Sequence, residues 1–137
     1  SDTYSYPHQK EIFLTQSTMQ TACFSLVVVK NPEGKWLVVD ETKNRGYWLP
    51  GGTVERGESF HEGAIRETKE EGGIDVELVG VLRAEFAQFS RCLRLKTIFF
   101  AVPKDPEQKP KSIPDNESLR AFWCNEKEIA DYDSKSL

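Results

Sequence analysis

Three glutamates near the middle of the chain, Glu67, Glu70 and Glu71, have a spacing that could bind a metal ion. On a helix, residues three and four apart share a face, so these carboxylates would crowd together and repel one another. A divalent cation relieves that repulsion, and hard oxygen ligands suit Mg²⁺ or Mn²⁺. Gly51 and Gly52 precede them, and backbone without side chains lets carbonyls approach an ion or a phosphate closely. The pattern favours a cation site over the alternative, an ordinary solvated run of charge.

The glutamates need a helix to position them, and the sequence predicts one from Ser59 to Glu71. Ser59 with Glu62 three residues later forms a capping box, which is typical of a helix start. Gly72 and Gly73 supply a C-terminal stop.

The phase of this helix separates two kinds of side chain. At about 100° per residue, Glu67 and Glu71 project in line with the apolar Phe60 and Ala64. Arg66 falls on the opposite side, which is the expected solvent face. A row that begins apolar therefore ends acidic, as expected for a cation site that is partly shielded from water.

From Gly52 to Ile74 the sequence resembles the Nudix box. That pattern is Gly, five residues, Glu, seven residues, Arg-Glu, an aliphatic residue, any residue, Glu-Glu, any residue, Gly and an aliphatic residue. The matching positions are Gly52, Glu58, Arg66, Glu67, Glu70, Glu71, Gly73 and Ile74. Thr68 stands where the family usually has Ile, Leu or Val, and it resembles Val in shape and volume.

This resemblance implies an α/β fold, namely an α/β/α sandwich with a central mixed β-sheet and a catalytic loop-helix-loop. It also implies an enzyme, a metal-dependent pyrophosphohydrolase that cleaves a nucleoside diphosphate linked to another group, X. We expect residues 1–137 to form a single domain, in which residues 1–16 are a mobile arm or an edge strand. The family pattern fades toward the end of the chain, so we expect a short closing helical layer.

The resemblance also implies roles for individual residues. It assigns metal ligation to the Gly51 carbonyl and to Glu67, Glu70 and Glu71. Arg66 would orient the glutamates, and Glu70, or else Glu67, would act as the general base. A further metal ligand is expected before the final strand at Glu117, with Asp115 as its neighbour and rival.

A phosphorylated substrate needs cations and a flat apolar surface outside the glutamate cluster. The strands beyond the helix carry four basic residues: Arg83, Arg91, Arg94 and Lys96. Of these we expect Arg83 and Arg91 to bind substrate, against the alternative of surface charge ladders. The candidates for stacking on a base are Tyr47, Trp48, Phe86 and Phe89, of which we select Trp48 and Phe86. The alternative, a core residue, is the commoner role for any single one of them.

The substrate class is indicated by a second and looser similarity. Residues 47–52, with Glu117, Ser118 and Trp123, look like the subgroup that removes oxidised purine nucleoside di- or triphosphates. Dinucleoside polyphosphates, nucleotide sugars and diphosphoinositol polyphosphates stay open as substrates.

The alternative to an enzyme is a Nudix-fold module that binds a nucleotide without cleaving it. Such modules usually lose box glutamates, which this chain has kept.

Composition limits the partners. The chain has 18 Lys and Arg against 22 Asp and Glu, a net charge of -4. Polymeric nucleic acid or an anionic membrane is therefore not expected as the main partner, and no apolar run is long enough to span a bilayer.

Cys23, Cys92 and Cys124 lack the paired spacing of zinc or dithiol sites, so we expect buried, reduced thiols in a cytoplasmic protein. No pattern indicates an oligomeric state.

The remaining elements follow from apolar alternation and turn residues. Strands are expected at residues 22–30, 36–40, 47–49, 74–82, 85–89, 93–102 and 119–124. The first two would form a hairpin around residues 31–34. Residues 103–114 hold four prolines and should form a surface loop with Lys109 and Lys111 in solvent, before a helical turn at 126–131.

Overall fold

The computed structural model describes residues 20–41, 46–115 and 118–129, so the arm or strand expected at residues 1–16 lies outside the described residues. The strands are β1 (Gln20–Val29), β2 (Trp36–Glu41), β3 (Gly46–Trp48), β4 (Gly51–Thr53), β5 (Val76–Phe89), β6 (Cys92–Pro103) and β7 (Ser118–Cys124). The helical segments are α2 (Phe60–Glu67), a π-helical turn η1 (Thr68–Gly72), and residues 126–129. None of the helices within these ranges has the length and apolar composition that a bilayer crossing requires.

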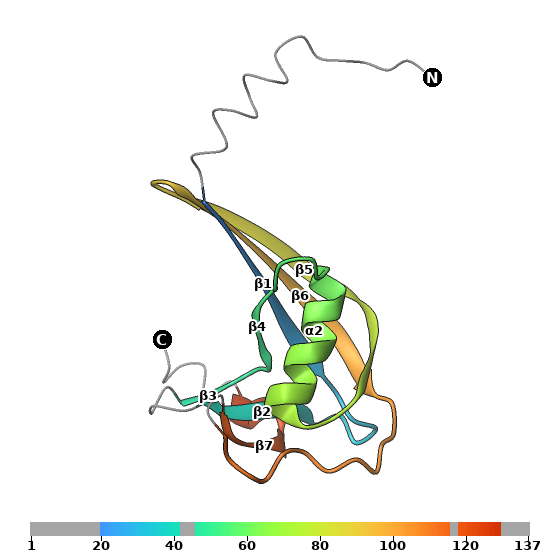
Figure 1. Ribbon diagram of the computed structural model, residues 1–137. Coiled ribbons are helices and arrows are strands. Elements are labelled where there is room, and N and C mark those ends of the chain that lie inside the picture. The colour runs from blue at the N-terminus through green and yellow to red at the C-terminus, as the bar shows by residue number, and fades with distance from the viewer. Residues whose placement is uncertain (1–19, 42–45, 116–117, 130–137) are drawn as a thin grey trace, which may run out of the picture.

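The strands form two sheets around the helix (Figure 1). The larger sheet has the order β4-β1-β6-β5, in which β1 and β6 run parallel and the other pairs antiparallel. The smaller sheet, β3-β2-β7, is antiparallel. Helix α2 lies on one face of the larger sheet, where the Ser25 hydroxyl donates to the Phe60 carbonyl at 2.8 Å. The expected α/β fold with a mixed sheet is confirmed.

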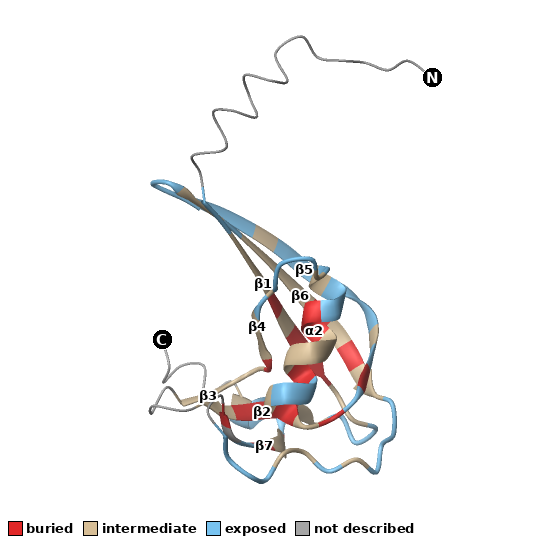
Figure 2. Ribbon diagram, in the orientation of Figure 1, coloured by how far each residue is buried: buried red, intermediate tan, exposed pale blue. Residues whose placement is uncertain are grey.

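The core lies between α2 and the sheets (Figure 2). Val27 and Val29 of β1 stand opposite Phe99 and Ala101 of β6, and these four side chains are buried with Ala64 of α2. Directly opposed residues share a face of a sheet. Odd-numbered residues of β1 and β6 therefore face the helix, and even-numbered residues face away from it.

The hairpin expected from residues 22–30 and 36–40 is wrong. Strands β1 and β2 belong to different sheets, and an isolated bridge between Lys30 and Trp36 connects them. The reason is the Val27–Val29 run, which is buried on both faces of the sheet and so belongs to a central strand. Such a strand pairs with β6 along its whole length rather than with its neighbour in sequence.

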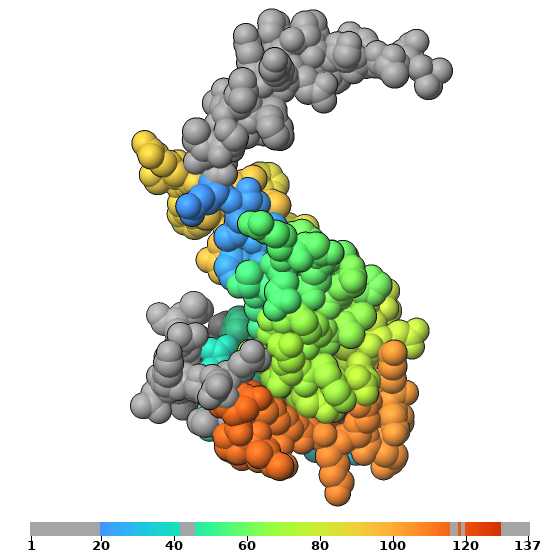
Figure 3. Space-filling view, in the orientation of Figure 1, coloured from blue at the N-terminus to red at the C-terminus, as the bar shows by residue number. Residues whose placement is uncertain are grey.

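Residues 76–89 form one strand, where two were expected. The pairing of β5 with β6 skips a residue at Val79 and again at Leu82. Each bulge reverses which side chains point to which face, so the alternation in the sequence breaks although the strand continues. The outer part of the β5–β6 hairpin projects from the helix-covered body (Figure 3).

The cysteines are free thiols, as expected. Cys124 is buried, while Cys23 and Cys92 are only partly so, which corrects the expectation that all three are buried. Burial, with the nearby Glu128 carboxylate, raises the pKa of the Cys124 thiol to about 11. A thiol with a raised pKa is a poor nucleophile and metal ligand.

Candidate active site

The glutamate helix begins where the sequence predicts. The Ser59 hydroxyl accepts from the Glu62 amide at 3.0 Å, and the Glu62 carboxylate accepts from the Ser59 amide at 3.2 Å. This reciprocal capping box satisfies two amides that a helix start leaves without partners. Its first turn is thereby fixed to the end of the preceding loop.

The end of the helix differs from the expected regular α-helix. From Thr68 the chain widens into η1, and Gly73 ends it with a φ of 77°. Thr68, the residue that departs from the box, is buried, and its hydroxyl donates to the Ala64 carbonyl at 2.7 Å. A π-helical turn has more residues per turn than an α-helix, so Glu70 and Glu71 do not follow the 100° phase assumed from sequence.

Arg66 occupies the centre of the site, and its expected place on the solvent face is wrong. Its side chain is 22% exposed and bonds Glu58 in a bidentate pair, Nε to Oε2 at 2.7 Å and Nη2 to Oε1 at 2.9 Å. Nη1 contacts Glu67 Oε1 at 3.0 Å and Glu70 Oε2 at 3.2 Å, and Nη2 donates to the Thr53 carbonyl at 3.0 Å. A helical wheel gives the direction of Cβ only, and the long arginine side chain reaches back over the loop.

This network shifts the pKa values of both partners in the Glu58–Arg66 pair. Hydrogen bonds from Arg66, and secondarily from the Glu55 amide, lower the pKa of Glu58 from 4.5 to about 2. The carboxylates of Glu58 and Glu67 raise the pKa of Arg66 above its already high value. Both groups therefore stay charged across the physiological range.

The two glycines lie directly against the glutamates. The Gly51 amide donates to Glu71 Oε1 at 2.8 Å. A Cβ on Gly52 would lie 2.8 Å from Cδ and Oε1 of Glu67. The backbone at Gly52 thus approaches the Glu67 carboxylate more closely than any side chain would allow.

The oxygen atoms at this site are of the chemical type that binds a hard divalent cation. The Glu71 carboxylate accepts from the Gly51 amide, and Arg66 binds the carboxylates of Glu67 and Glu70. Oxygen donors of this type suit Mg²⁺. Within the part of the chain that the structure describes, however, no three His, Cys, Asp or Glu side chains form a finished metal centre. Arg66 instead bridges two of the glutamates. The Glu70 side chain is 41% exposed, which leaves it room to turn toward a cation.

The further metal ligand expected before the last strand is Glu117, with Asp115 as the alternative. Glu117 lies outside the described residues, so its metal role stays a prediction. Its rival Asp115 has both carboxylate oxygens engaged, Oδ2 by Lys111 Nζ and Oδ1 by the Ser118 amide at 3.1 Å. Lys111, expected in solvent, has a side chain only 11% exposed, so that expectation is wrong.

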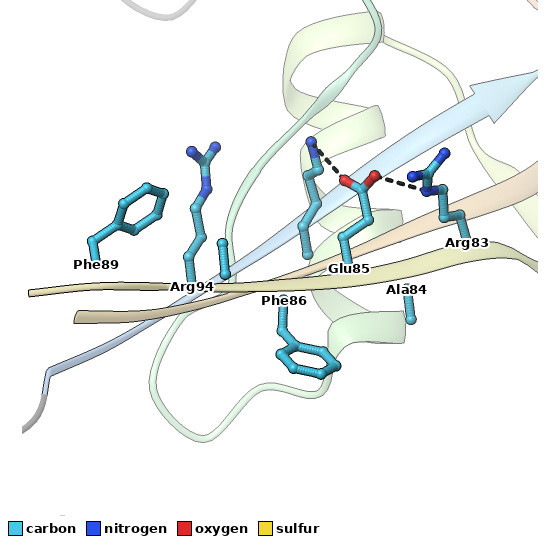
Figure 4. Close-up of a pocket in the computed structure, with 8 residues that line it drawn as sticks. Arg83, Ala84, Glu85, Phe86, Phe89 and Arg94 are labelled. Carbon is cyan, nitrogen blue, oxygen red and sulfur yellow. Dashed lines mark ion pairs between the residues drawn. The ribbon is translucent and has the colours of Figure 1, made fainter.

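A cavity of about 500 Å³ opens on the β5–β6 hairpin (Figure 4). It is lined by Arg83, Ala84, Glu85, Phe86, Ala87, Phe89, Arg94 and Lys96. Glu85 forms ion pairs with Arg83 at 2.7 Å and with Lys96 at 3.2 Å. The Arg94 guanidinium lies 4.7 Å from the centre of the Phe24 ring. The cavity is thus a basic surface with aromatic edges.

Sheet register connects this cavity to the glutamate cluster. Thr53, Phe24, Lys96 and Glu85 lie in one row across four strands, on the face away from α2. Adjacent strands are about 4.8 Å apart, so Lys96 lies roughly 10 Å from Thr53. Thr53 is at one end of this row, and its carbonyl accepts a hydrogen bond from Arg66, which binds the glutamates. The row therefore connects the cavity to the glutamate cluster.

The residues expected to bind substrate divide into two groups. Arg83 and Phe86 border the cavity, although the Phe86 ring points to the other side of the sheet (Figure 4). Arg91 lies in the turn between β5 and β6 and does not line the cavity. Trp48 lies on β3 beside a small hollow under Ile129.

The cavity also contains residues that were not selected from the sequence. The sequence predicts substrate contacts for Arg83 and Arg91, whereas Arg94, Lys96 and Glu85 line the cavity beside Arg83. A signal was available in the alternation itself. Glu85 lies two residues after Arg83, and Lys96 two after Arg94, so strand pairing brings the four charges to one face.

Comparison with known proteins gives a consistent assignment. The family model described as NUDIX domain matches residues 19–136. The mouse (Mus musculus) protein named 8-oxo-dGDP phosphatase NUDT18 is 34% identical over 122 residues, covering 87% of this chain and 37% of its own length. The Bacillus subtilis (strain 168) protein named putative 8-oxo-dGTP diphosphatase YtkD is 41% identical over 68 residues, covering 50% of this chain and 42% of its own length. This chain thus spans less than half of either relative.

A solved structure of a MutT protein from Methanosarcina mazei Go1 superposes with a TM-score of 0.65 at 20% identity. The match covers 86% of this chain and 91% of that one. At this identity the likeness supports the fold alone.

The Glu58–Arg66 pair predicts a specific dependence of stability on pH. A carboxylate with a lowered pKa stabilises the fold fully above its unfolded pKa, and that stability is lost as pH falls toward its folded pKa. The difference in free energy of unfolding between wild type and Glu58→Gln should be constant above about pH 5 and shrink toward about pH 2. Urea unfolding followed by tryptophan fluorescence over a pH series measures it. A difference that does not change with pH contradicts the assignment.

The close approach at Gly52 predicts that Gly52→Ala displaces the Glu67 carboxylate. We expect Mn²⁺ binding, measured by isothermal titration calorimetry, to weaken about 10-fold or more, as when other supports of metal ligands are removed. Gly80→Ala is the matched control, because a Cβ at Gly80 meets nothing within 4 Å. Equal Mn²⁺ affinities for the two variants would contradict the role of Gly52.

Proposed function

Because this chain belongs to the NUDIX domain family, we propose that it is a divalent-metal-dependent hydrolase of a nucleoside diphosphate linked to X. The observation that carries the proposal is the cluster in which Arg66 binds both Glu67 and Glu70, with the Glu67 carboxylate directly against the Gly52 backbone. A nucleotide-binding module without activity has no need to keep these carboxylates in place. We assign the substrate to the small nucleotides rather than to polymeric nucleic acid, and the action of the protein to the cytoplasm.

Each residue of the cluster has a proposed task. Glu67, Glu70, Glu71 and the Gly51 carbonyl would hold Mg²⁺ or Mn²⁺, with Glu117 as a further ligand. When bound, the cation neutralises diphosphate charge and lowers the pKa of water. Glu70 acts as the general base, because its exposed carboxylate can reach a water molecule. Arg66 orients the glutamates through the bonds it makes to them.

The cavity on β5 and β6 is the proposed substrate site. Arg83, Arg94 and Lys96 offer three cations to phosphate, while Glu85 can accept a hydrogen bond from the N–H edge of a base. The rings of Phe24 and Phe89 give apolar surface on the same face of the sheet. Together with the names of the relatives, these groups favour an oxidised purine nucleoside di- or triphosphate.

The activity is tested by phosphate release from a panel with and without Mg²⁺. The panel holds canonical and oxidised purine nucleotides, dinucleoside polyphosphates, ADP-ribose and inositol pyrophosphates. Mg²⁺-dependent turnover that is highest for an oxidised purine nucleotide is the expected result. Tight nucleotide binding without turnover of any compound would overturn the proposal in favour of a binding module.

Removal of the carboxylates should stop the reaction. We expect Glu70→Gln and Glu71→Gln each to lower kcat by about 10²-fold to 10⁴-fold, the range for loss of an acid–base or metal-binding group. Glu77→Gln, an exposed glutamate on β5, is the matched control and should keep wild-type turnover. Full Mg²⁺-dependent activity in both box variants would show that the chemistry lies elsewhere.

The cavity makes a separate prediction about binding. Arg94→Met should raise KM about 10-fold with little change in kcat, since a hydrogen bond to a charged group contributes about 1.5–3 kcal/mol. Lys104→Met, which removes an exposed charge just after β6, should change neither value. Steady-state kinetics on the preferred compound of the panel provide the measurement, and an unchanged KM would remove the cavity from the substrate site.

A further inference from the structure

Lys111 joins two segments that are distant in sequence. Its ammonium lies 2.6 Å from Asp115 Oδ2, 2.9 Å from Ser118 Oγ and 3.2 Å from the Glu70 carbonyl. An ammonium has three N–H donors, so these three oxygens can use all of them. One contact is on the turn η1, one is with Asp115 on the loop before β7, and one is with Ser118, the first residue of β7.

The backbone of Lys111 makes the same connection. Its amide donates to the Gly72 carbonyl at 2.8 Å, and its carbonyl accepts from the Ala121 amide at 2.8 Å. A Cβ on Gly73 would lie within 2.7–2.9 Å of the amide nitrogen, Cα and Cβ of Lys111. The last glycine of the box is therefore required both by its positive φ and by the chain at Lys111 that packs on it.

Ser118 completes the contact. It is fully buried, and its hydroxyl donates to the Glu71 carbonyl at 3.3 Å. Lys111 and Ser118 thus bind the carbonyls of two successive residues, Glu70 and Glu71. Carbonyls at a helix end otherwise lack partners, and a cation there is favourable. These bonds fix how the last turn is rotated, and with it the direction of the two carboxylates.

We propose that Lys111 is a positioning residue for the metal site. Through Glu70 and Ser118 it sets the orientation of η1 against the start of β7, and this orientation determines the affinity of the glutamates for a divalent cation. The proposal rests on the proposed metal site, but its test does not depend on which nucleotide is hydrolysed.

Electrostatics alone predicts the opposite effect of removing the charge. Loss of a positive charge beside Glu70, Glu71 and Asp115 makes the surroundings more negative, which favours cation binding. Loss of positioning weakens cation binding. The sign of the change therefore separates the two causes.

The experiment measures Mn²⁺ affinity by calorimetry on the full chain, for wild type, Lys111→Met and the control Lys109→Met. Lys109 is exposed in the same loop and carries the same charge. We expect Lys111→Met to bind Mn²⁺ about 10-fold more weakly, the usual cost of losing a support of a metal ligand. Lys109→Met should bind as wild type does. Unchanged or tighter binding by Lys111→Met, or equal weakening in Lys109→Met, would overturn the proposal.

Ser118→Ala provides a second route if Lys111→Met does not fold, as judged by circular dichroism. It removes the hydroxyl that both Lys111 and Glu71 contact, and we expect about threefold weaker Mn²⁺ binding. Where both variants fold, the double variant should lose less affinity than the product of the single losses, because both act through one contact. Unchanged affinity in Ser118→Ala, or strictly multiplicative losses, would contradict positioning. A wild-type chain that does not bind Mn²⁺ would instead refute the proposed function.

Discussion

The guanidinium of Arg66 connects the loop before the glutamate helix to the carboxylates at the end of that helix. It pairs with Glu58 on the loop side and with Glu67 and Glu70 on the helix side, and it binds the Thr53 carbonyl of β4. Without this cation the acids would face one another with no compensation for their charge. Because the compensating charge is part of the chain, the cluster can assemble before any metal ion arrives.

The two ends of the glutamate segment are held by different means. At the start, the capping box is made by local residues, so it needs nothing from the rest of the fold. At the end, carbonyls of the π-helical turn are bound by Lys111 and Ser118, which come from more than thirty residues further along the chain. The carboxylates that we propose as cation ligands thus lie at the end that is bound by residues distant in sequence. Such support limits how far side-chain flexibility can change the geometry of a site.

Local rules predicted the helix start and the glycine stop, because a cap depends on residues within one turn. They missed the inward reach of Arg66, whose guanidinium bonds Glu58 on the preceding loop. They also missed the π-helical turn, whose carbonyls are bound by Lys111 and Ser118. The strand at β5 was divided wrongly because the bulges at Val79 and Leu82 disturb its period. The prediction of a β1–β2 hairpin was wrong for a related reason. A strand that is buried on both faces selects its partners by packing. Locally encoded features were predictable, and features encoded by distant contacts were not.

The cavity lies on the β5–β6 hairpin, whose outer part extends away from helix α2 (Figure 1). Val81, Phe86 and Phe89 of this hairpin are each more than half exposed, so little apolar burial opposes its local opening. A ligand that contacts both strands adds cross-strand interactions where the fold has fewest. A ligand bound in the cavity would therefore slow amide hydrogen exchange along both strands, and part of its binding free energy would be used to order the hairpin.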